Sequence, residues 1–509
     1  MVKGAKEGTL TDIDGNFSVK GKVGNTLSIS YVGFSPLEVK VTKLEGNRFI
    51  LKEDSKLLDE VVVVGMDKQK RNTITAAVST VASDAIVNRP VTDLTSALQG
   101  NVAGLNFVTD AAPDGVGGET GAEIKFNIRG VGSINGNGGE PYVLVDGVEQ
   151  SLQNVNPNDI ETISVLKDAS AAAVYGARAA YGVVLVTTKS GRQEKTRVSY
   201  RGTVGFSSPI NMPEMMNSLE FAKYVNERND NDGVNHKFSD ALIEKMEGFM
   251  KNPYSAEFPG IGPNQNGTDW ASSMDAVYAN TDWFDYYFKD TAIRHSHNLS
   301  VTEGSEKFNY YVGLGYTYQD GLLDKVDDNL SKYNVNTKFQ IIANKWLKFN
   351  FNNNITLSIL KRPMANQTIF YGTLGQTIPN APTHYPIDSE YNDASEFRYL
   401  KESHYVQNRI SDAMSFAATI TPLPGWDIVG EMKVRFDVED NSFKRGYPTV
   451  EKPDGELKVD IGTKQGYVYP GMEWKNSKWG SYTRGNAFNY YLSPNVSTSY
   501  VHTWGEHYF

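Results

Sequence analysis

The hydrophobic pattern separates the chain into four stretches, and the longest of them runs from about residue 196 to the end. Apolar and polar residues alternate there, as in "FNYYVGLGYTYQ" (308–319), "LKFNFNNNITLS" (347–358) and "DIVGEMKVRFDV" (427–438). A period of two residues predicts β-strands with one apolar face. These strands run for about ten residues or more, whereas five or six residues are usual in soluble sheets.

Alternation alone fits a soluble sandwich as well as a membrane barrel, because both bury one face of each strand. The connections favour the barrel. Tight ones lie near 303–306, 343–346, 422–425 and 505–506, and long ones lie at 207–295, 319–332, 359–410 and 440–482. Trp346, Trp426 and Trp504 stand beside tight connections, as an aromatic belt at one membrane interface requires. We therefore predict a transmembrane β-barrel over residues 192–509.

The number of strands indicates that this barrel is incomplete. About eight strands can be counted, and a ninth begins at "HYF" (507–509). A barrel of about eight strands is filled by its own side chains, whereas barrels with a plugged lumen have about 22. The region 73–191, with an expected radius of gyration of roughly 13–14 Å, is too large for the smaller barrel. We expect a piece of a longer protein, cut at both ends.

Residues 73–191 have the pattern of a compact α+β domain. We expect a helix over Leu94–Ala103, with Asp93 as its cap and Gly104 as its stop, and a two-residue hairpin turn at Asp146-Gly147. Strands are predicted in "FNIRGVG" (126–132), "PYVLVDGVEQ" (141–150), "ETISVLK" (161–167) and "GVVLVTTK" (182–189). Asp168 is expected to cap a short helix, "ASAAAVYG" (169–176).

Two shorter stretches precede this domain. Residues 1–55 read as a small antiparallel β-sandwich with strands over Thr26–Val32 and Leu37–Val41, too small to be complete. Residues 56–72 form a charged linker that contains "LDEVVVVG" (58–65). The valines Val61–Val64 strongly favour an extended strand, and no partner strand is apparent at hairpin distance. We therefore expect an unpaired, extended peptide in the linker.

Composition excludes several classes of protein. The 509 residues have a formal charge of -10, too acidic for a nucleic-acid binder, and the absence of cysteine excludes disulfide scaffolds and Cys-based zinc sites. No apolar run approaches the 18 or so residues of a membrane-spanning helix. The start, "MVKGAKEGTL", has no signal peptide, so an exported protein would have its true N-terminus upstream.

Catalytic, cofactor and metal sites are not predicted, and we do not expect an enzyme. The glycine-rich segment 115–139 contains no phosphate-binding motif, and no Ser-His-Asp set is identifiable. His295 and His297 could share a metal, but without a third ligand a role in the barrel wall or rim is favoured. Arg129 could pair with a barrel carboxylate or be solvated in the lumen. Aromatic residues in the long loops could stack on sugars, although packing is favoured: Trp270, Trp283, Tyr286, Tyr287, Tyr371 and Tyr385.

Four segments resemble the SusC/RagA-type TonB-dependent transporters of the Bacteroidetes outer membrane. They are "GTLTDIDGNFSVKGKVGNTLSISYVGF" (8–34), "IRGVGSINGNGGEPYVLVDGV" (128–148), "LKDASAAAVYGARAAYGVVLVTTKSG" (166–191) and "TDWFDYYFKDTAIRHSHNLSVTEGSEKFNYYVGLGYTYQDGLL" (281–323). The first is similar to part of a carboxypeptidase-regulatory-like domain, and the next two to plug motifs. The plug-motif residues are Ile128, Arg129, Gly130, Asp146, Gly147, Lys167, Asp168, Tyr175, Gly176, Arg178 and Gly182.

The resemblance implies energy-coupled import of oligosaccharides or peptides across the outer membrane, without a cofactor. It implies TonB as the periplasmic partner, a SusD-like surface lipoprotein as a lid and outer-membrane lipid around the barrel. The TonB box would be Asp59, Glu60, Val61, Val62, Val63, Val64 and Gly65, which could join a sheet edge of TonB by strand addition.

Alternatives remain open at this point. Val61–Val64 could instead be the last strand of the N-terminal domain or the first strand of the plug. The same scaffold could serve a receptor, signal transducer or adhesin that does not transport, and a secreted carbohydrate-active enzyme is a third possibility. The sequence does not identify the cargo.

Overall fold

The computed structural model describes most of the chain in two compact units. The described residues are 9, 17–19, 22–29, 37–43, 49, 61–64, 67–70, 78–87, 94–102, 104–109, 120–122, 124–128, 130, 139–168, 172–191, 194–210, 212–271, 273–363, 374–389, 392, 394–395, 403–444, 449–459, 482–501, 503–504 and 507–508. One unit comprises Met1–Thr80 and Ser164–Val183, and the other comprises Val81–Ile163 and Val184–Phe509.

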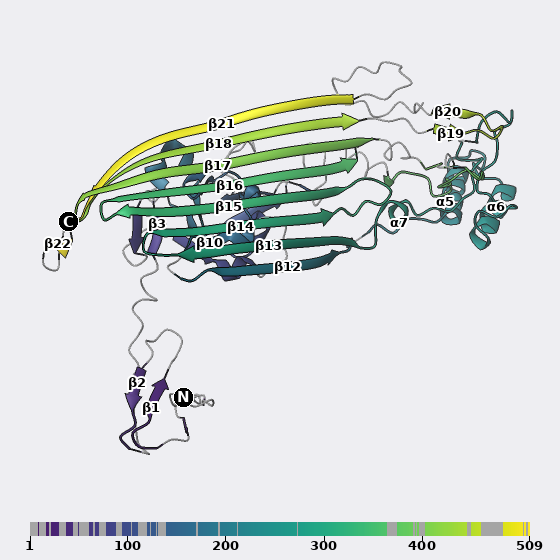
Figure 1. Ribbon diagram of the computed structural model, residues 1–509. Helices are drawn as coiled ribbons and strands as arrows, with labels where there is room; N and C mark the ends of the chain where they lie inside the picture. The colour runs from purple at the N-terminus through teal and green to yellow at the C-terminus, as the bar shows by residue number, and fades with distance from the viewer. Residues whose placement is uncertain are drawn as a thin grey trace. The chain divides into compact units, whose positions relative to one another are not determined.

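An eight-stranded antiparallel sheet dominates the larger unit, and its strands lie side by side in chain order (Figure 1). The strands are β12 (Arg197–Ser207), β13 (Ala292–Gly304), β14 (Phe308–Asp320), β15 (Asn329–Asn344), β16 (Leu347–Pro363), β17 (His404–Leu423), β18 (Trp426–Lys444) and β21 (Tyr482–Tyr500). Their number matches the prediction. The tight turns predicted near 303–306, 343–346 and 422–425 join neighbouring strands at one end, whereas the one predicted at 505–506 lies outside the described residues. Because β14 and β15 are longer than expected, the connection predicted at 319–332 shrinks to 321–328.

Each strand of this sheet has an apolar face and a polar face, as the alternation predicts. In β14, Phe308 and Leu314 are exposed, whereas Asn309 and Tyr311 on the opposite face are buried. The register carries this division across the sheet, since Leu314 lies opposite Val335 of β15 and Gly315 opposite Asn334. Cross-strand neighbours therefore share a face, and the apolar outer face is continuous from strand to strand.

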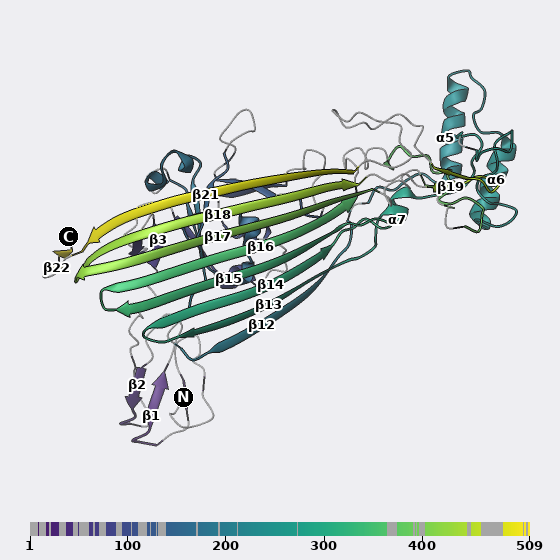
Figure 2. The same cartoon turned by 45° about the horizontal axis from the view of Figure 1, so that its top comes forward.

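The part of a second sheet that belongs to the larger unit lies against the polar, inner face of the first (Figure 2). Its strand order is β5-β10-β11-β8-β9, formed by β5 (Val78–Ala82), β8 (Tyr142–Val145), β9 (Val148–Glu149), β10 (Ile160–Leu166) and β11 (Val183–Thr188). β6 (Leu105–Thr109) pairs separately with β7 (Ile124–Ile128). The short helix α2 (Ser83–Val87) follows β5. Buried aliphatic side chains from β10 and β11 form the core: Ile160, Ile163, Val165, Leu166, Val183, Val184 and Val186.

Two helices of this domain differ from their predictions. Helix α3 covers Leu94–Leu98 instead of Leu94–Ala103, because Gly100 adopts a φ of 77° and the amide of Asn101 binds the carbonyl oxygen of Ala97 at 2.9 Å. The expected cap Asp93 lies outside the described residues. The second helix is the 3₁₀-helix η4 (Ala173–Ala179), whose N-cap is Ala172 rather than Asp168 and which is interrupted at Gly176.

The smaller unit contains two short hairpins. β1 (Thr26–Ile29) pairs with β2 (Leu37–Lys40), the two strands expected in the N-terminal domain. β3 (Val61–Val64) pairs with β4 (Asp67–Lys70), so the expectation of an unpaired valine peptide was wrong. Strand β4 was not predicted from the sequence, because its four residues, "DKQK", are all polar and show no alternation.

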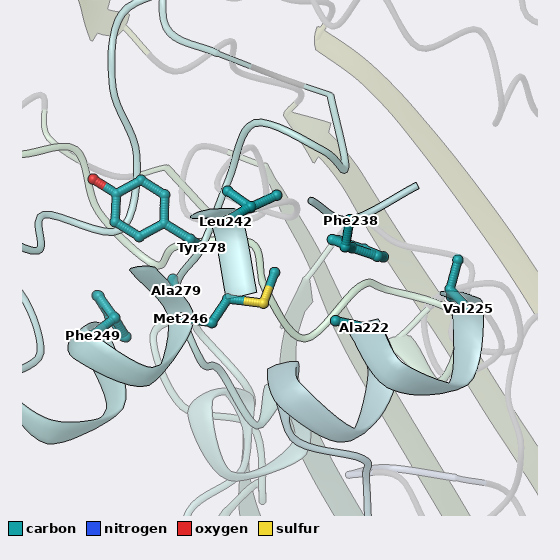
Figure 3. Close-up of a cluster of buried hydrophobic side chains, with 8 residues drawn as sticks. All are labelled: Ala222, Val225, Phe238, Leu242, Met246, Phe249, Tyr278 and Ala279. Carbon is teal, nitrogen blue, oxygen red and sulfur yellow. The ribbon is translucent and has the colours of Figure 1, made fainter. Parts of the chain in front are cut away.

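The long connection between β12 and β13 folds around a hydrophobic core of its own. Its helices are α5 (Ser218–Asn231), α6 (Asp240–Lys251) and α7 (Trp283–Tyr287). Figure 3 shows eight buried side chains of this core: Ala222, Val225, Phe238, Leu242, Met246, Phe249, Tyr278 and Ala279. A later connection adds to it, because the amide of Asn380 donates to the carbonyl oxygens of Met274 and Val277, both at 2.8 Å.

The short hairpins β19 (Thr449–Glu451) with β20 (Leu457–Val459) and β22 (Thr503–Trp504) with β23 (His507–Tyr508) complete the larger unit. The ninth strand expected at the end of the chain therefore coincides with the two-residue strand β23. Among the described residues, none of the helices has the length and apolar character needed to cross a membrane.

Candidate functional site: the plug seat

A buried ion pair joins the turn between β8 and β9 to the inner face of the large sheet. The Nζ of Lys338, on β15, lies 2.7 Å from Oδ1 of Asp146, and the two side chains are 11% and 13% exposed. Lys338 also donates to the carbonyl oxygen of Thr188, while the hydroxyl of Thr188 donates to Oδ2 of Asp146, both at 2.7 Å. Low exposure strengthens such a pair and makes the loss of either partner costly.

The turn that presents Asp146 is fixed by its backbone. Asp146 and Gly147 have φ of 48° and 81°, and Val145 pairs with Val148 across them. This is the predicted two-residue hairpin turn, in which both central residues need positive φ. The turn therefore positions the Asp146 carboxylate towards the sheet.

Side chains of the large sheet also bind main-chain carbonyls at the C-terminus of the 3₁₀-helix η2 (Leu152–Asn154). Lys332 donates to the carbonyl oxygen of Gln153 at 3.0 Å, and the hydroxyl of Thr356 donates to that of Asn154 at 2.5 Å. Asn334 donates to the same Asn154 oxygen at 3.3 Å, and Arg435 donates to the carbonyl oxygen of Glu149. The sheet thus satisfies the carbonyls of Gln153 and Asn154, which the end of η2 leaves without helical partners, and one carbonyl of β9.

A buried carboxyl group completes the contact. Asp159, at the end of the 3₁₀-helix η3 (Pro157–Asp159), is 3% exposed, and its Oδ1 accepts a hydrogen bond of 2.7 Å from the hydroxyl of Tyr311 on β14. Its Oδ2 has no hydrogen-bond partner among the described residues. Burial raises the pKa of Asp159 to about 6, although Tyr311, Lys189 and Lys338 act in the opposite direction. We call this set of contacts, from Asp146 to Asp159 on one side and from β13 to β18 on the other, the plug seat.

The raised pKa of Asp159 predicts a pH dependence of stability. Because the pKa of Asp159 rises from 3.8 to about 6, the folded state holds this proton at pH values where the unfolded state has released it. The free energy of unfolding therefore falls as the pH increases from about 4 to about 6. The loss amounts to about 3 kcal/mol at 1.36 kcal/mol per unit. Asp159→Asn keeps an oxygen for Tyr311 and should remove this loss, making the variant more stable than the wild type at pH 7 and equal to it near pH 4. Thermal unfolding of the detergent-solubilised protein from pH 4 to 8 would measure this, and a wild type with no slope there would contradict it.

Comparison with known proteins now places this arrangement in a family. The TonB-dependent Receptor Plug Domain family matches residues 70–183, and the CarboxypepD_reg-like domain family matches residues 1–63. The chain is 32% identical over 374 residues to the TonB-dependent receptor SusC of Bacteroides thetaiotaomicron, covering 68% of this chain and 32% of that protein. The chain belongs to the SusC/RagA-like TonB-dependent receptors.

A second relative supports the same family, and a solved structure has the same fold. TonB-dependent receptor P26 of Formosa agariphila is 32% identical over 474 residues, covering 89% of this chain and 42% of that receptor. The structure of the RagAB peptide importer in the closed-closed state has the same fold, with a TM-score of 0.62, 23% identity and coverage of 85% of this chain and 46% of that one. The chain thus spans less than half the length of these proteins. Since the relatives are TonB-dependent receptors, the expectation that the chain is not an enzyme is confirmed.

In this TonB-dependent receptor, most of the predicted plug-motif residues lie at the ends of strands or at turns of the plug backbone. Ile128 ends β7, and Lys167 and Asp168 follow β10. Gly130, Gly176 and Gly182 have φ of 104°, 67° and 94°, which explains the need for glycine at these points. Tyr175 and Arg178 lie on η4, beside Gly176. Asp146 is the motif residue that we connect directly to the large sheet.

Several other predicted residues occupy different parts of the receptor. Arg129 lies outside the described residues, as do Asp59, Glu60 and Gly65 of the predicted TonB box. The CarboxypepD_reg-like match extends to residue 63, so the assignment of Val61–Val64 to a TonB box stays a prediction. His295 and His297 lie on the outer face of β13, and Tyr200 contacts His297 at 2.7 Å.

The loop aromatics pack the long connections, which is the interpretation that the sequence favoured. Trp283, Tyr287 and Tyr385 are 1%, 3% and 9% exposed, and the rings of Trp270 and Tyr385 stack at 5.0 Å. Tyr286 is half-buried beside Trp283, with the rings 5.8 Å apart. Tyr371 lies outside the described residues.

Sequence reasoning missed the residues of the large sheet that hold the plug: Lys332, Asn334, Lys338, Tyr311, Thr356 and Asn298. One signal was available for Tyr311 and Thr356, because each occupies the polar phase of a predicted strand, whereas Lys332 lies in the connection predicted at 319–332. Glycines within a strand also suggest the close approach of another segment, and "VGLG" (312–315) contains two.

Proposed function

We propose that the whole protein imports a nutrient across the outer membrane, driven by TonB. The plug seat carries the proposal: a compact domain is held by buried polar contacts on the inner face of a long-stranded sheet whose outer face is apolar. A sheet with an apolar outer face suits lipid, and a polar inner face suits a water-filled lumen. The plug would close this lumen until energy supplied by TonB displaced it.

The family guides the choice of cargo and partners. RagAB is a peptide importer, and the resemblance to SusC/RagA proteins supports oligosaccharides or peptides as cargo for this chain. TonB would bind the linker from the periplasm, and a SusD-like lipoprotein would cover the opposite end of the barrel. The ordered loops around α5, α6 and α7 lie at the end of the sheet away from the tight turns and would face that lipoprotein (Figure 1).

Growth experiments test import directly. A strain that lacks the gene should lose growth on at least one member of a panel of oligosaccharides and peptides offered as the sole carbon source. Loss of TonB should produce the same defect, and the cloned gene should restore growth. Unchanged growth on every member, together with retained binding at the cell surface, would favour the receptor or adhesin function instead.

A further inference from the structure

Two glycines on the inner face of β14, Gly313 and Gly315, each lie beside a side chain of the plug. Neither Gly313 nor Gly315 has a positive φ, so the backbone there would accept any residue. Glycine in a strand interior lowers strand stability, because it adds chain entropy to the unfolded state and offers no side chain to pack. The presence of glycine at these two positions is therefore best explained by neighbouring atoms that leave no space for a side chain.

That space is occupied by the plug. A Cβ atom at Gly313 would lie less than 3.0 Å from Oδ1 of Asp159, and a Cβ atom at Gly315 would lie less than 3.0 Å from Nδ2 of Asn156. Real Cβ atoms essentially never make such contacts. Asp159 and Asn156 are 3% and 6% exposed, so neither side chain can turn towards solvent without leaving the contact.

Hydrogen bonds to flanking residues fix each of these side chains in place. Tyr311, two residues before Gly313 on the same face, donates to Asp159 at 2.7 Å. Asn156 donates to Oδ1 of Asn298, at 2.8 Å, and Asn298 lies directly opposite Gly315 in the register of β13 and β14. Each glycine thus leaves space for a plug side chain, and a neighbouring residue of the sheet, Tyr311 or Asn298, forms a hydrogen bond with that side chain.

The spacing of the two segments also matches. Asn156 is the N-cap of η3 and Asp159 its last residue, so the two are three residues apart, about one turn of a 3₁₀-helix or roughly 6 Å. Gly313 and Gly315 are two residues apart on one strand face, roughly 6.6 Å. One turn of helix therefore spans the same distance as the two openings, and a shift of the plug by one residue along β14 would bring both side chains against other residues.

We propose that Gly313 and Gly315 are two sockets that set the closed position of the plug by receiving Asp159 and Asn156. The proposal rests on the proposed function, since a correctly seated plug is what closes the channel. In this proposal the sockets set the position of the plug along β14, whereas the Lys338–Asp146 pair is one of the contacts that hold the plug to the sheet. Filling either socket should displace η3 and let solutes leak past the plug.

The test uses the full-length protein with Gly313→Ala or Gly315→Ala, measured as ion conductance in planar bilayers without cargo or TonB. We expect about a tenfold increase in the open fraction, the order expected when one methyl group overpacks a tight contact. Gly485→Ala is the matched control, because Gly485 lies on the inner face of β21, where a Cβ would meet nothing within 4 Å. Immunoblots of outer membranes establish that each variant is assembled.

Paired variants separate a socket from general damage to the strand. Asp159→Ala removes the side-chain atoms that a methyl group at position 313 would contact. The double variant Gly313→Ala/Asp159→Ala should therefore leak no more than Asp159→Ala alone. Asn156→Ala should do the same for Gly315→Ala. The proposal is overturned if Gly313→Ala and Gly315→Ala match the Gly485→Ala control, or if the double variants leak as the sum of the single ones. If wild-type protein shows no channel even after denaturant has unfolded its plug, the proposed import function itself is wrong.

Discussion

Deletion of Asp59–Gly65 from the full-length protein is expected to abolish uptake of the cargo and to leave its binding at the cell surface unchanged. Among the described strands, the valine strand β3 pairs only with β4, so its second edge carries backbone groups that another strand could bind. Strand addition draws its affinity from such main-chain hydrogen bonds. Without the segment TonB would have no strand to bind, whereas the cargo site in the barrel would be intact.

Two proline variants make this prediction more specific. Val64 lies opposite Asp67 and Val62 opposite Gln69. In an antiparallel hairpin every second residue pair exchanges backbone hydrogen bonds, so Val64 and Val62 are expected to bond to β4. The N–H of Val63 is therefore expected on the free edge, where Val63→Pro would remove a donor to TonB. Val62→Pro would instead weaken the pairing with β4.

Uptake and cross-linking to the periplasmic domain of TonB would distinguish the two variants. We expect Val63→Pro to lose most uptake and cross-linking, and Val62→Pro to keep more of both. Normal uptake after the deletion would show that the TonB box lies elsewhere and would favour the interpretation of β3 as a strand of the N-terminal domain.

Lys338→Met should loosen the plug more than any other single change in the plug seat. The variant leaves the Asp146 carboxylate in a site where its side chain is 13% exposed, without its charged partner. Removing one partner of a buried pair typically costs about 3–5 kcal/mol. We expect a lower unfolding temperature of the purified protein and sensitivity of cells to antibiotics too large for ordinary porins.

Two further variants control this prediction. Lys237→Met breaks the exposed pair with Asp275, whose side chains are 44% and 41% exposed, and should change stability by less than about 1 kcal/mol. Adding Asp146→Asn to Lys338→Met removes the uncompensated charge and keeps a residue that tolerates positive φ, so it should restore part of the loss. Equal effects of Lys338→Met and Lys237→Met would show that the buried pair does not hold the plug.

Local pattern was sufficient for the elements whose signal lies in neighbouring residues. The long strands, their apolar face and the turn at Asp146-Gly147 depend on alternation and on turn chemistry, which are local properties of the chain. Helix α3 was predicted too long because two glycines, Gly100 and Gly104, could each end it, and the first of them does so with Asn101. β4 was missed because a strand of polar residues gives no periodic signal.

The sequence by itself determined the family, the order of the domains and the division of each long strand into an apolar and a polar face. Only the tertiary structure decided which polar residues of that inner face have a partner in the plug. Lys338 and Asp146 are separated by 192 positions, and Tyr311 and Asp159 by 152. Such pairs form because the strand register and the turn of a hairpin bring distant segments together, and no pattern of neighbouring residues encodes that distance.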